Sequence, residues 1–590
     1  MKNVKKLSPI IFILIIFTYL HYREAKNDYF KFEPNVTLPN NQKVYLVFKE
    51  SAKELGTYHD YETFFDPKMI MRNYKNFIPT NTSVAVADID NDGFQDILFC
   101  NGKSERHFYL YKNNGKGKFV DVTNEYGLND DTSMKRMQMG VFFDYDNDGY
   151  KDLLVAFTYE IKLFRNIKGK KFEDVSNLIN KTKLDSLITG IKVFDYNRDG
   201  LTDIYLTTIF RLRRDANGYS SAYFVPNVTK RNRDAGGPNY LLKNTGKGLT
   251  IIHDAGGASN DQLAWDAIIM DLNGDGWLDI LVGNDYSLNR SFENTKRGRF
   301  VETTDTRFEK QFSSANMGFS VSDINNDGLF DIFVTNVSRS TLAPLQVNHM
   351  FVQTPERFFL DKFQEYGNGR CGWAWGSQFV DFDLDGDDEL IVANGMFNDG
   401  KKDYFYNWFS YAVLPPFLIS NPLILPPSEG HFLAKDERNC FFKKNTNGKF
   451  DDVALSVGID DIKNGRGVAA IDIENNGKVS FVIANYNDKP TFYKNVSIKQ
   501  HNWVGLKLIG KKSGKDAYGA ILKLTNNGIS KYKYYYPTQG FSAQTDPRVV
   551  FGLKDEFLEE YQLEVIWPSG QIDYFNNLRM NAYNTIEESR

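Results

Sequence analysis

The sequence predicts an all-β protein, a seven-bladed β-propeller followed by a small C-terminal β-rich domain. An acidic loop, Asp-x-Asp/Asn-x-Asp-Gly-x-x-Asp, recurs along most of the chain, and a short aliphatic run follows each copy. The copies are about fifty residues apart, a period typical of solenoids and propellers. Near residue 500 the pattern stops and a different alternation of apolar and polar residues begins. These observations indicate a repeat domain and a separate C-terminal module.

Six copies of the loop carry an oxygen-bearing side chain at positions one, three, five and nine and a glycine at position six. They are Asp88, Asp90, Asp92 and Asp96; Asp144, Asp146, Asp148 and Asp152; Asp195, Asn197, Asp199 and Asp203; Asp271, Asn273, Asp275 and Asp279; Asp323, Asn325, Asp327 and Asp331; and Asp381, Asp383, Asp385 and Glu389. A seventh copy has Asp472, Glu474 and Asn476 but ends on Ser480.

This spacing suits Ca²⁺, which takes six or more oxygen ligands at about 2.3 to 2.6 Å. The glycine permits a turn with positive φ after the third ligand. An EF-hand starts in the same way but needs a glutamate at position twelve, where this chain has apolar strand residues. They are Phe99, Val155, Leu206, Val282, Val334 and Val392. Asp-Gly pairs also form plain hairpin turns, but six full sets of oxygens favour about six structural calcium ions.

The number of carboxylates predicts an order of affinity, because fewer charged ligands bind Ca²⁺ less tightly. The loops that begin at Asp88, Asp144 and Asp381 are expected to bind most tightly. The three loops that contain an asparagine ligand come next, and the loop at Asp472 is expected to bind weakly or not at all.

A second hairpin recurs between the loops and gives each unit four strands. Examples are Tyr109 to Asn113 followed by Gly117 to Thr123, and Leu163 to Asn166 followed by Lys171 to Val175. The last unit lacks its final strand. Residues 43–51 resemble that missing strand, so we expect them to pair with the last blade and cover its edge.

Small residues such as Gly140, Gly318 and Gly467 precede several loops and are expected on inner strands, where blades crowd the axis. Trp265, Trp373 and Trp375 lie near the same strands. They either pack between blades or line a ligand site at one mouth of the channel, since an aromatic concavity is a default candidate site.

The composition excludes several classes of protein. The net charge is -4 with no basic cluster typical of nucleic-acid binding, so no nucleic-acid partner is expected. Only three cysteines occur, Cys100, Cys371 and Cys440, so we expect neither a disulfide framework nor a cysteine metal cluster. All three are expected to pack as small apolar side chains.

The N-terminus indicates export. Three lysines precede an apolar run that ends near Leu20, which is either a cleaved signal peptide or a single N-terminal membrane anchor, with the body outside the cytoplasm. The expected domains are therefore 1–26, the propeller at 27–498, and the C-terminal domain at 499–590. A proline-rich apolar stretch, 409–427, reads as an insertion, since prolines break a helix.

The repeats resemble the FG-GAP or VCBS (integrin-α-like) calcium-repeat family over roughly residues 80 to 495. The tail resembles the ASPIC/UnbV domain of proteins similar to the cartilage acidic protein family, on Asn502 to Leu508, Ala517 to Ala520, Phe551 to Leu553 and Leu563 to Gly570. The resemblance implies an extracytoplasmic, calcium-dependent binding or adhesion protein.

Three functions stay open on the sequence. The first is a cell-surface or secreted module that binds a glycan or a protein. The second is a polysaccharide lyase or hydrolase with a site at the propeller mouth, although the histidines are scattered and no catalytic signature occurs. The third is a structural part of a surface complex. An anionic ligand is conceivable at one arginine-rich segment, whose members are Arg211, Arg213, Arg214, Arg231 and Arg233. An open concavity would favour the enzyme, and a filled mouth would favour binding.

Overall fold

The computed structural model describes residues 46–59, 82–100, 106, 108–128, 137–157, 160–214, 220–222, 236–309, 314–338, 347–396, 402–403, 431–432, 437–498, 501–554 and 561–589. Val44–Arg590 form one compact unit. The expected export segment at 1–26 and the insertion at 409–427 lie outside the described residues. Among the described residues, no helix is long and apolar enough to cross a membrane.

Each Asp-Gly unit lies in its own antiparallel sheet, with the acidic loop between the first two strands. The strands, sheet by sheet, are β2 (Ser83–Ala87), β3 (Asp96–Cys100), β4 (Phe108–Asn113) and β5 (Phe119–Asp121); β6 (Met137–Phe143), β7 (Asp152–Phe157), β8 (Ile161–Asn166) and β9 (Phe172–Asp174); β10 (Ser186–Phe194), β11 (Asp203–Arg214), β13 (Tyr240–Asn244) and β14 (Leu249–Ile252); β15 (Leu263–Met270), β16 (Asp279–Ser287), β17 (Arg290–Asn294) and β18 (Phe300–Glu302); β20 (Phe319–Ser322), β21 (Asp331–Val334), β23 (His349–Gln353) and β24 (Phe359–Asp361); β25 (Gly372–Val380), β26 (Glu389–Asn394), β29 (Cys440–Lys444) and β30 (Phe450–Asp452); and β31 (Gly465–Ile471), β32 (Ser480–Asn485), β33 (Thr491–Asn495) and β1 (Phe48–Glu50).

Shorter strands, helices and turns accompany these sheets. They are strands β12 (Ser220–Ala222), β19 (Ser314–Ala315), β22 (Val337–Ser338), β27 (Lys402–Asp403) and β28 (His431–Phe432), helices α2 (Ala52–Leu55), α3 (Thr304–Arg307) and α4 (Phe363–Tyr366), and the 3₁₀ turns η3 (Ser176–Leu178), η4 (His253–Gly257) and η6 (Ala454–Val457).

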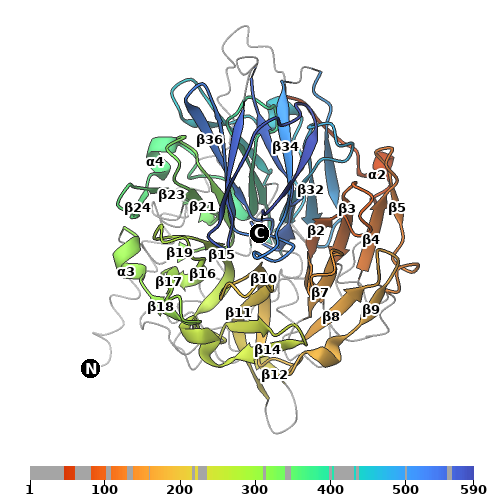
Figure 1. Ribbon diagram of the computed structural model, residues 1–590, viewed down its shortest axis with the longest axis vertical. Coiled ribbons are helices and arrows are strands. Elements are labelled where there is room, and N and C mark those ends of the chain that lie inside the picture. The colour runs from red at the N-terminus through yellow and green to blue at the C-terminus, as the bar shows by residue number, and fades with distance from the viewer. Residues whose placement is uncertain are drawn as a thin grey trace. The chain divides into compact units, whose positions relative to one another are not determined.

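The first strands of successive sheets contact one another in the order β2, β6, β10, β15, β20, β25 and β31, and β31 returns to contact β2. The sheets therefore form a closed ring, the arrangement of a β-propeller. Figure 1 shows the sheets following one another from red through yellow to green. β3 is buried along its whole length, because such a second strand is covered by the sheets on either side. The prediction of an all-β propeller is confirmed.

An N-terminal strand closes the ring. β1 pairs antiparallel with β33, from Phe48 opposite Asn495 to Glu50 opposite Tyr493. The Phe48 ring lies 5.3 Å from that of Phe382 and 5.0 Å from that of Phe481. The first described strand of the chain thus supplies the outer strand of the last sheet.

The C-terminal domain consists of two sheets that pack on the ring. One contains β38 (Val549–Gly552), β34 (Trp503–Ile509) and β41 (Tyr583–Glu587). The other contains β36 (Ile529–Tyr535), β35 (Ala520–Asn526), β39 (Gln562–Ile566) and β40 (Ile572–Phe575). A further short strand, β37 (Ala543–Gln544), leaves this domain and pairs parallel with β2.

The prediction for the cysteines was wrong for two of the three. Cys371, just before β25, and Cys440, the first residue of β29, form a disulfide across 69 residues of sequence. Both strands belong to the sixth sheet, so the register of that sheet brings the two residues together, although their spacing in the sequence gives no sign of it. Cys100 is buried and free, as expected of a small apolar side chain.

Candidate metal loops and a filled channel

The acidic loops have the backbone that the sequence predicts. The glycine at position six has φ near +90° in the first two loops, with +89° at Gly93 and +90° at Gly149. The residue at position four is also left-handed, with φ of 59° at Asn91 and 61° at Leu384. The first aspartate accepts a hydrogen bond from the glycine, as in Gly93 N to Asp88 Oδ2 at 3.1 Å. The turn therefore folds back onto its first ligand.

The acid at position nine, which we call the closing acid, fastens the loop to two strands. Asp96 Oδ2 accepts from Ile89 N at 3.1 Å, and Asp96 Oδ1 accepts from Asn113 N at 2.8 Å. The same pair of bonds recurs at Asp152, Asp203, Asp279 and Asp331. Each carboxylate oxygen keeps a second lone pair for another partner. The closing acid is thus held in place before any ion binds.

Carboxylates converge in three of the six full loops. The oxygens of Asp88, Asp90 and Asp96, those of Asp144, Asp146 and Asp152, and those of Asp381, Asp383 and Asp385 each lie within 4.8 Å of one another. Several carboxylate oxygens in these loops are buried and, within the described part of the chain, have no hydrogen-bond partner. They are the Oδ1 atoms of Asp88, Asp90, Asp146, Asp381 and Asp383. Orphaned anionic oxygens at this spacing fit a hard cation such as Ca²⁺.

Burial raises the pKa of the loop carboxylates. It raises the pKa of Asp152 to about 8 and the pKa of Asp195 to about 6. Burial, together with the neighbouring Asp516, raises the pKa of Asp144 to about 7. Desolvation disfavours a charged carboxylate, and a bound cation reverses that effect. The loops therefore favour a cation on electrostatic grounds.

The other loops are arranged differently. In the third, fourth and fifth loops the asparagine ligand donates to its neighbouring aspartate, as in Asn197 Nδ2 to Asp199 Oδ2 at 2.9 Å. In the seventh loop, Ser480 Oγ accepts from Asn495 N at 3.1 Å, so the serine replaces the backbone contact of the missing acid but not its charge. Tyr583 of the C-terminal domain donates to Asp472 Oδ2 at 3.0 Å.

A ring of side-chain amides, which the sequence analysis missed, links each sheet to the loop before it. The amide at the end of a third strand donates to the carbonyl at position two of the preceding loop. The pairs are Asn113 with Ile473, Asn166 with Ile89, Asn244 with Tyr145, Asn294 with Tyr196, Gln353 with Leu272 and Asn495 with Phe382. Lys444 takes this place in the sixth sheet and donates to Ile324. The asparagine that recurs at the second hairpin was the sign of this ring in the sequence.

Residues 536–548 of the C-terminal domain fill the channel, and we call them the channel segment. They reach the inner strands of the ring through hydrogen bonds. The bonds are Ser542 Oγ to Thr82 O, Phe142 N to Gln544 Oε1, Lys192 Nζ to Thr538 O, Val321 N to Gln539 Oε1, Gln378 Nε2 to Gln539 O, and Ala470 N to Thr545 Oγ1. The bond lengths run from 2.7 to 2.9 Å.

Phe541 anchors the channel segment. Its ring lies 6.0 Å from that of Trp265 and 5.1 Å from that of Trp375. A Cβ on Gly318 would meet Phe541 N at 2.7 Å, so a residue without a side chain is needed just before β20 for the close approach. Two of the three candidate tryptophans therefore pack on the channel segment. Trp373 lies at the start of β25, two residues before Trp375, and its backbone N–H donates to Glu437 Oε2 at 2.6 Å.

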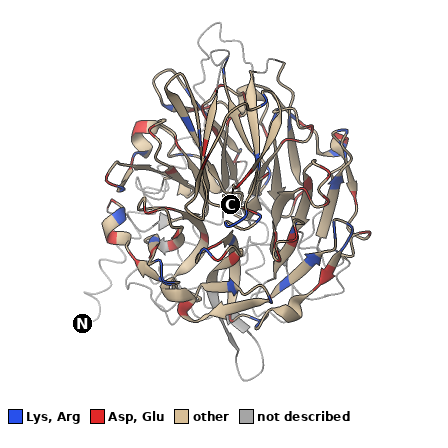
Figure 2. Cartoon of the chain, viewed as in Figure 1, with Lys and Arg blue, Asp and Glu red and all other residues tan. Residues whose placement is uncertain are grey.

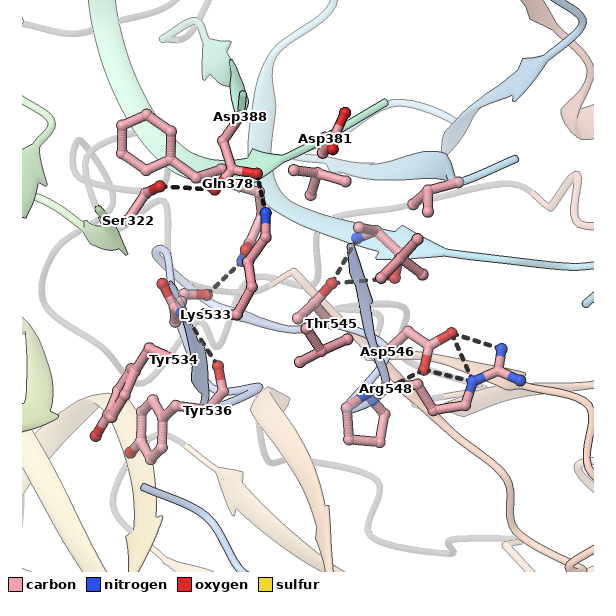
Figure 3. A pocket seen from close by; sticks show the side chains of 18 of the residues that line it. Ser322, Gln378, Asp381, Asp388, Lys533, Tyr534, Tyr536, Thr545, Asp546 and Arg548 are labelled. Atoms are coloured by element: carbon pink, nitrogen blue, oxygen red, sulfur yellow. Dashed lines mark hydrogen bonds and ion pairs between the residues drawn. The ribbon is translucent and has the colours of Figure 1, made fainter. Parts of the chain in front are cut away.

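A cavity of about 100 Å³ lies between the fifth to seventh sheets and the C-terminal domain. Figure 3 shows Lys533 ion-paired with Asp388, and Arg548 ion-paired with Asp546 at 2.7 Å. Ser322 Oγ also donates to Asp388 Oδ2 at 2.6 Å. The charged groups in the wall are largely paired with one another, so the cavity belongs to the interface between the two domains.

The side chains of Arg211, Arg213, Arg214, Arg231 and Arg233 lie outside the described residues. Figure 2 shows Lys and Arg interspersed with Asp and Glu over the described sheets.

Comparison with known proteins supports the same architecture. A model of the FG-GAP-like repeat matches residues 88–155, 144–206 and 271–334, and a model described as ASPIC and UnbV matches residues 510–590. No curated protein matches the chain.

Solved structures that resemble it include a lectin of Agrocybe aegerita that recognises non-reducing terminal N-acetylglucosamine, at 16% identity and a TM-score of 0.35, covering 63% of this chain and 79% of that one. Another is BBS1N in complex with ARL6DN, at 10% identity and a TM-score of 0.35, covering 75% of this chain and 98% of that one. These likenesses carry no functional weight. The two family matches identify FG-GAP-like repeats and a C-terminal ASPIC and UnbV domain in this chain.

Proposed function

We propose that this protein is an exported calcium-binding β-propeller that acts as a cell-surface or secreted module for binding a glycan or a protein. The observation that carries the proposal is the filled channel, because a propeller whose axis is packed by its own C-terminal segment offers a rigid surface rather than an axial reaction chamber. A filled mouth favours binding over the polysaccharide-cleaving alternative.

Calcium has a structural role in this proposal. The residues that would hold it are the four oxygen-bearing side chains of each full loop, about six ions in all if every loop is used. Bound Ca²⁺ would neutralise buried carboxylates such as Asp88 and Asp144. Export is supported by the Cys371–Cys440 disulfide, since such bonds persist in oxidising compartments.

The proposed ligand face is the mouth opposite the acidic loops. The C-terminal domain contacts the loop side, where Gly552 N donates to Asp381 Oδ2 at 3.1 Å and Lys515 N donates to Asn147 Oδ1 at 3.0 Å. The other mouth is where the first strands begin, and Trp373 lies there. Its Nε1 is buried and has no hydrogen-bond partner among the described residues.

A glycan array probed with the full-length chain tests the proposal. We expect binding that requires calcium and is abolished by a chelator. The variant Trp373→Phe keeps a ring and removes the N–H group, so weaker binding at an unchanged unfolding midpoint would support the proposed face, and unchanged binding would contradict it. Shortened or unsaturated sugar products would favour the enzyme alternative instead.

A further inference from the structure

One position of the third strand faces the acidic loop of its own sheet in nearly every repeat. The next residue along the strand donates its backbone N–H to the side chain at position nine of the loop. Asn113 N donates to Asp96 in this way, and Asn495 N donates to Ser480. Its occupants in chain order are Lys112, Arg165, Lys243, Glu293, Val352, Lys443 and Lys494. We call it the third-strand position.

Four basic occupants contact one or two of their loop's acids. Lys112 Nζ lies 2.7 Å from Asp92 Oδ2 and also contacts Asp90, and Arg165 Nη2 lies 2.5 Å from Asp146 Oδ2. The other two contacts are Lys243 with Asp199 at 3.3 Å and Lys494 with Glu474 at 2.8 Å. Each places a tethered positive charge beside the carboxylates that would hold the ion.

Lys443 contacts more carboxylates than any other residue at the third-strand position. Its Nζ lies 2.7 Å from Asp383 Oδ2, 3.2 Å from Asp385 Oδ2 and 2.7 Å from Glu389 Oε1. Glu389 is the closing acid of the sixth loop, is buried, and uses its other oxygen to accept from Phe382 N at 3.0 Å. The convergent carboxylates of this loop are Asp381, Asp383 and Asp385, without the closing acid that takes part in the first two loops. Lys443 thus places its positive charge among three of the four carboxylates of this loop.

The fourth loop carries the opposite charge at the same position. Glu293 Oε2 accepts from Asn273 Nδ2 at 3.1 Å, next to the ligand that lacks a charge. Its other oxygen is ion-paired with Arg307. A carboxylate therefore stands where four other loops have a lysine and one has an arginine. In the fifth loop the position is the neutral Val352.

We infer that the third-strand position sets the calcium affinity of each loop, with basic residues weakening it and Glu293 acting as an added oxygen donor to the fourth loop. The inference rests on the proposed calcium binding. It revises the order expected from the loop sequences, because the sixth loop becomes weaker than the first two and the fourth becomes stronger than the third. A unit charge this close to a divalent ion changes its affinity by at least about tenfold, even at the dielectric constant of water.

The test is calcium titration of the full-length chain by calorimetry, with bound calcium counted after equilibrium dialysis. The variant Lys443→Met is expected to tighten one site by at least about tenfold. Its matched control is Lys449→Met, since Lys449 lies in the same hairpin and has no ion pair within the described residues. The variant Glu293→Lys is expected to weaken one site by a similar factor, or to remove one ion from the count.

Two outcomes would overturn the inference while calcium binding itself stands. One is Lys443→Met titrating like Lys449→Met, and the other is Glu293→Lys binding calcium like the unaltered chain. If either variant fails to fold, Val352→Lys in the fifth loop gives an independent check and is expected to weaken one site. A chain that binds no calcium at all would instead remove the proposed function.

Discussion

Asn113 Nδ2 donates a hydrogen bond of 2.9 Å to the main-chain oxygen of Ile473, and this bond joins the first sheet to the loop of the last. It closes a ring of equivalent bonds, because every other third strand reaches back to the loop before it. The side chain also accepts from Gly115 N at 3.0 Å, so one residue shapes its own hairpin and holds the neighbouring repeat.

Replacing Asn113 by alanine should therefore destabilise the protein more than an ordinary surface change. The buried Ile473 carbonyl would lose its partner, which costs about 1–3 kcal/mol. Chemical denaturation measures the loss. The control is Asn114→Ala, whose side chain accepts only from exposed backbone groups of the turn at Lys116 and Lys118. Equal losses in the two variants would show that the link between sheets contributes little.

The Asn113–Ile473 bond shows which features of the fold the sequence could predict and which it could not. The strands and acidic loops follow from local signals, namely the aliphatic runs, the Asp-Gly turns and the regular spacing. The amide ring was visible only as a recurring asparagine, because its partner lies in a different repeat. Nothing in the alternation of Thr538 to Gln544 marks a segment that fills a channel, and the partner of Cys371 depends on a sheet register 69 residues away. Contacts between distant segments are therefore what the sequence left open.

The N-terminal strand gives a second prediction. Phe48 is buried among three rings at 5.0 to 5.4 Å, so Phe48→Ala should cost about 3–5 kcal/mol as a buried aromatic truncation. The neighbouring Val47 is 38% exposed, and Val47→Ala should stay within about 0.5 kcal/mol. Thermal unfolding of both variants measures the difference. A small effect at Phe48 would mean that the ring does not depend on this closing strand.

Phe541 links the two domains. Because its ring is buried between Trp265 and Trp375, Phe541→Ala should cost about 3–5 kcal/mol and loosen the channel segment. Limited proteolysis should then cut near residues 536–548 faster than in the unaltered chain. The exposed Ile529 of β36 is the control site, and Ile529→Ala should leave the cleavage rate unchanged. Unchanged protection in Phe541→Ala would show that the hydrogen bonds alone hold the segment.

The disulfide of the sixth sheet should contribute measurably to stability. Replacing both Cys371 and Cys440 by alanine is expected to lower the free energy of unfolding by about 2–4 kcal/mol, as for other disulfides that close long loops. Denaturation of the unaltered chain with and without a reductant gives a parallel measurement. The buried Cys100 is common to both proteins and does not confuse the comparison. A double variant as stable as the parent would contradict a stabilising role.

The raised pKa values of the loop carboxylates predict an unusual pH dependence for the calcium-free protein. Burial raises the pKa of Asp152 to about 8 and that of Asp144 to about 7, from 3.8 for an ordinary aspartate. A group with a raised pKa in the folded state stabilises that state below its unfolded pKa and loses the contribution as pH rises through its folded pKa. In a chelator, the unfolding midpoint should therefore fall between about pH 4 and pH 8. Calcium, which binds the ionised carboxylates, should stabilise the protein increasingly over the same range. Thermal scans across this range, with calcium and with chelator, measure both slopes, and a chelated midpoint that rises with pH would show that these carboxylates are not held protonated in the folded chain.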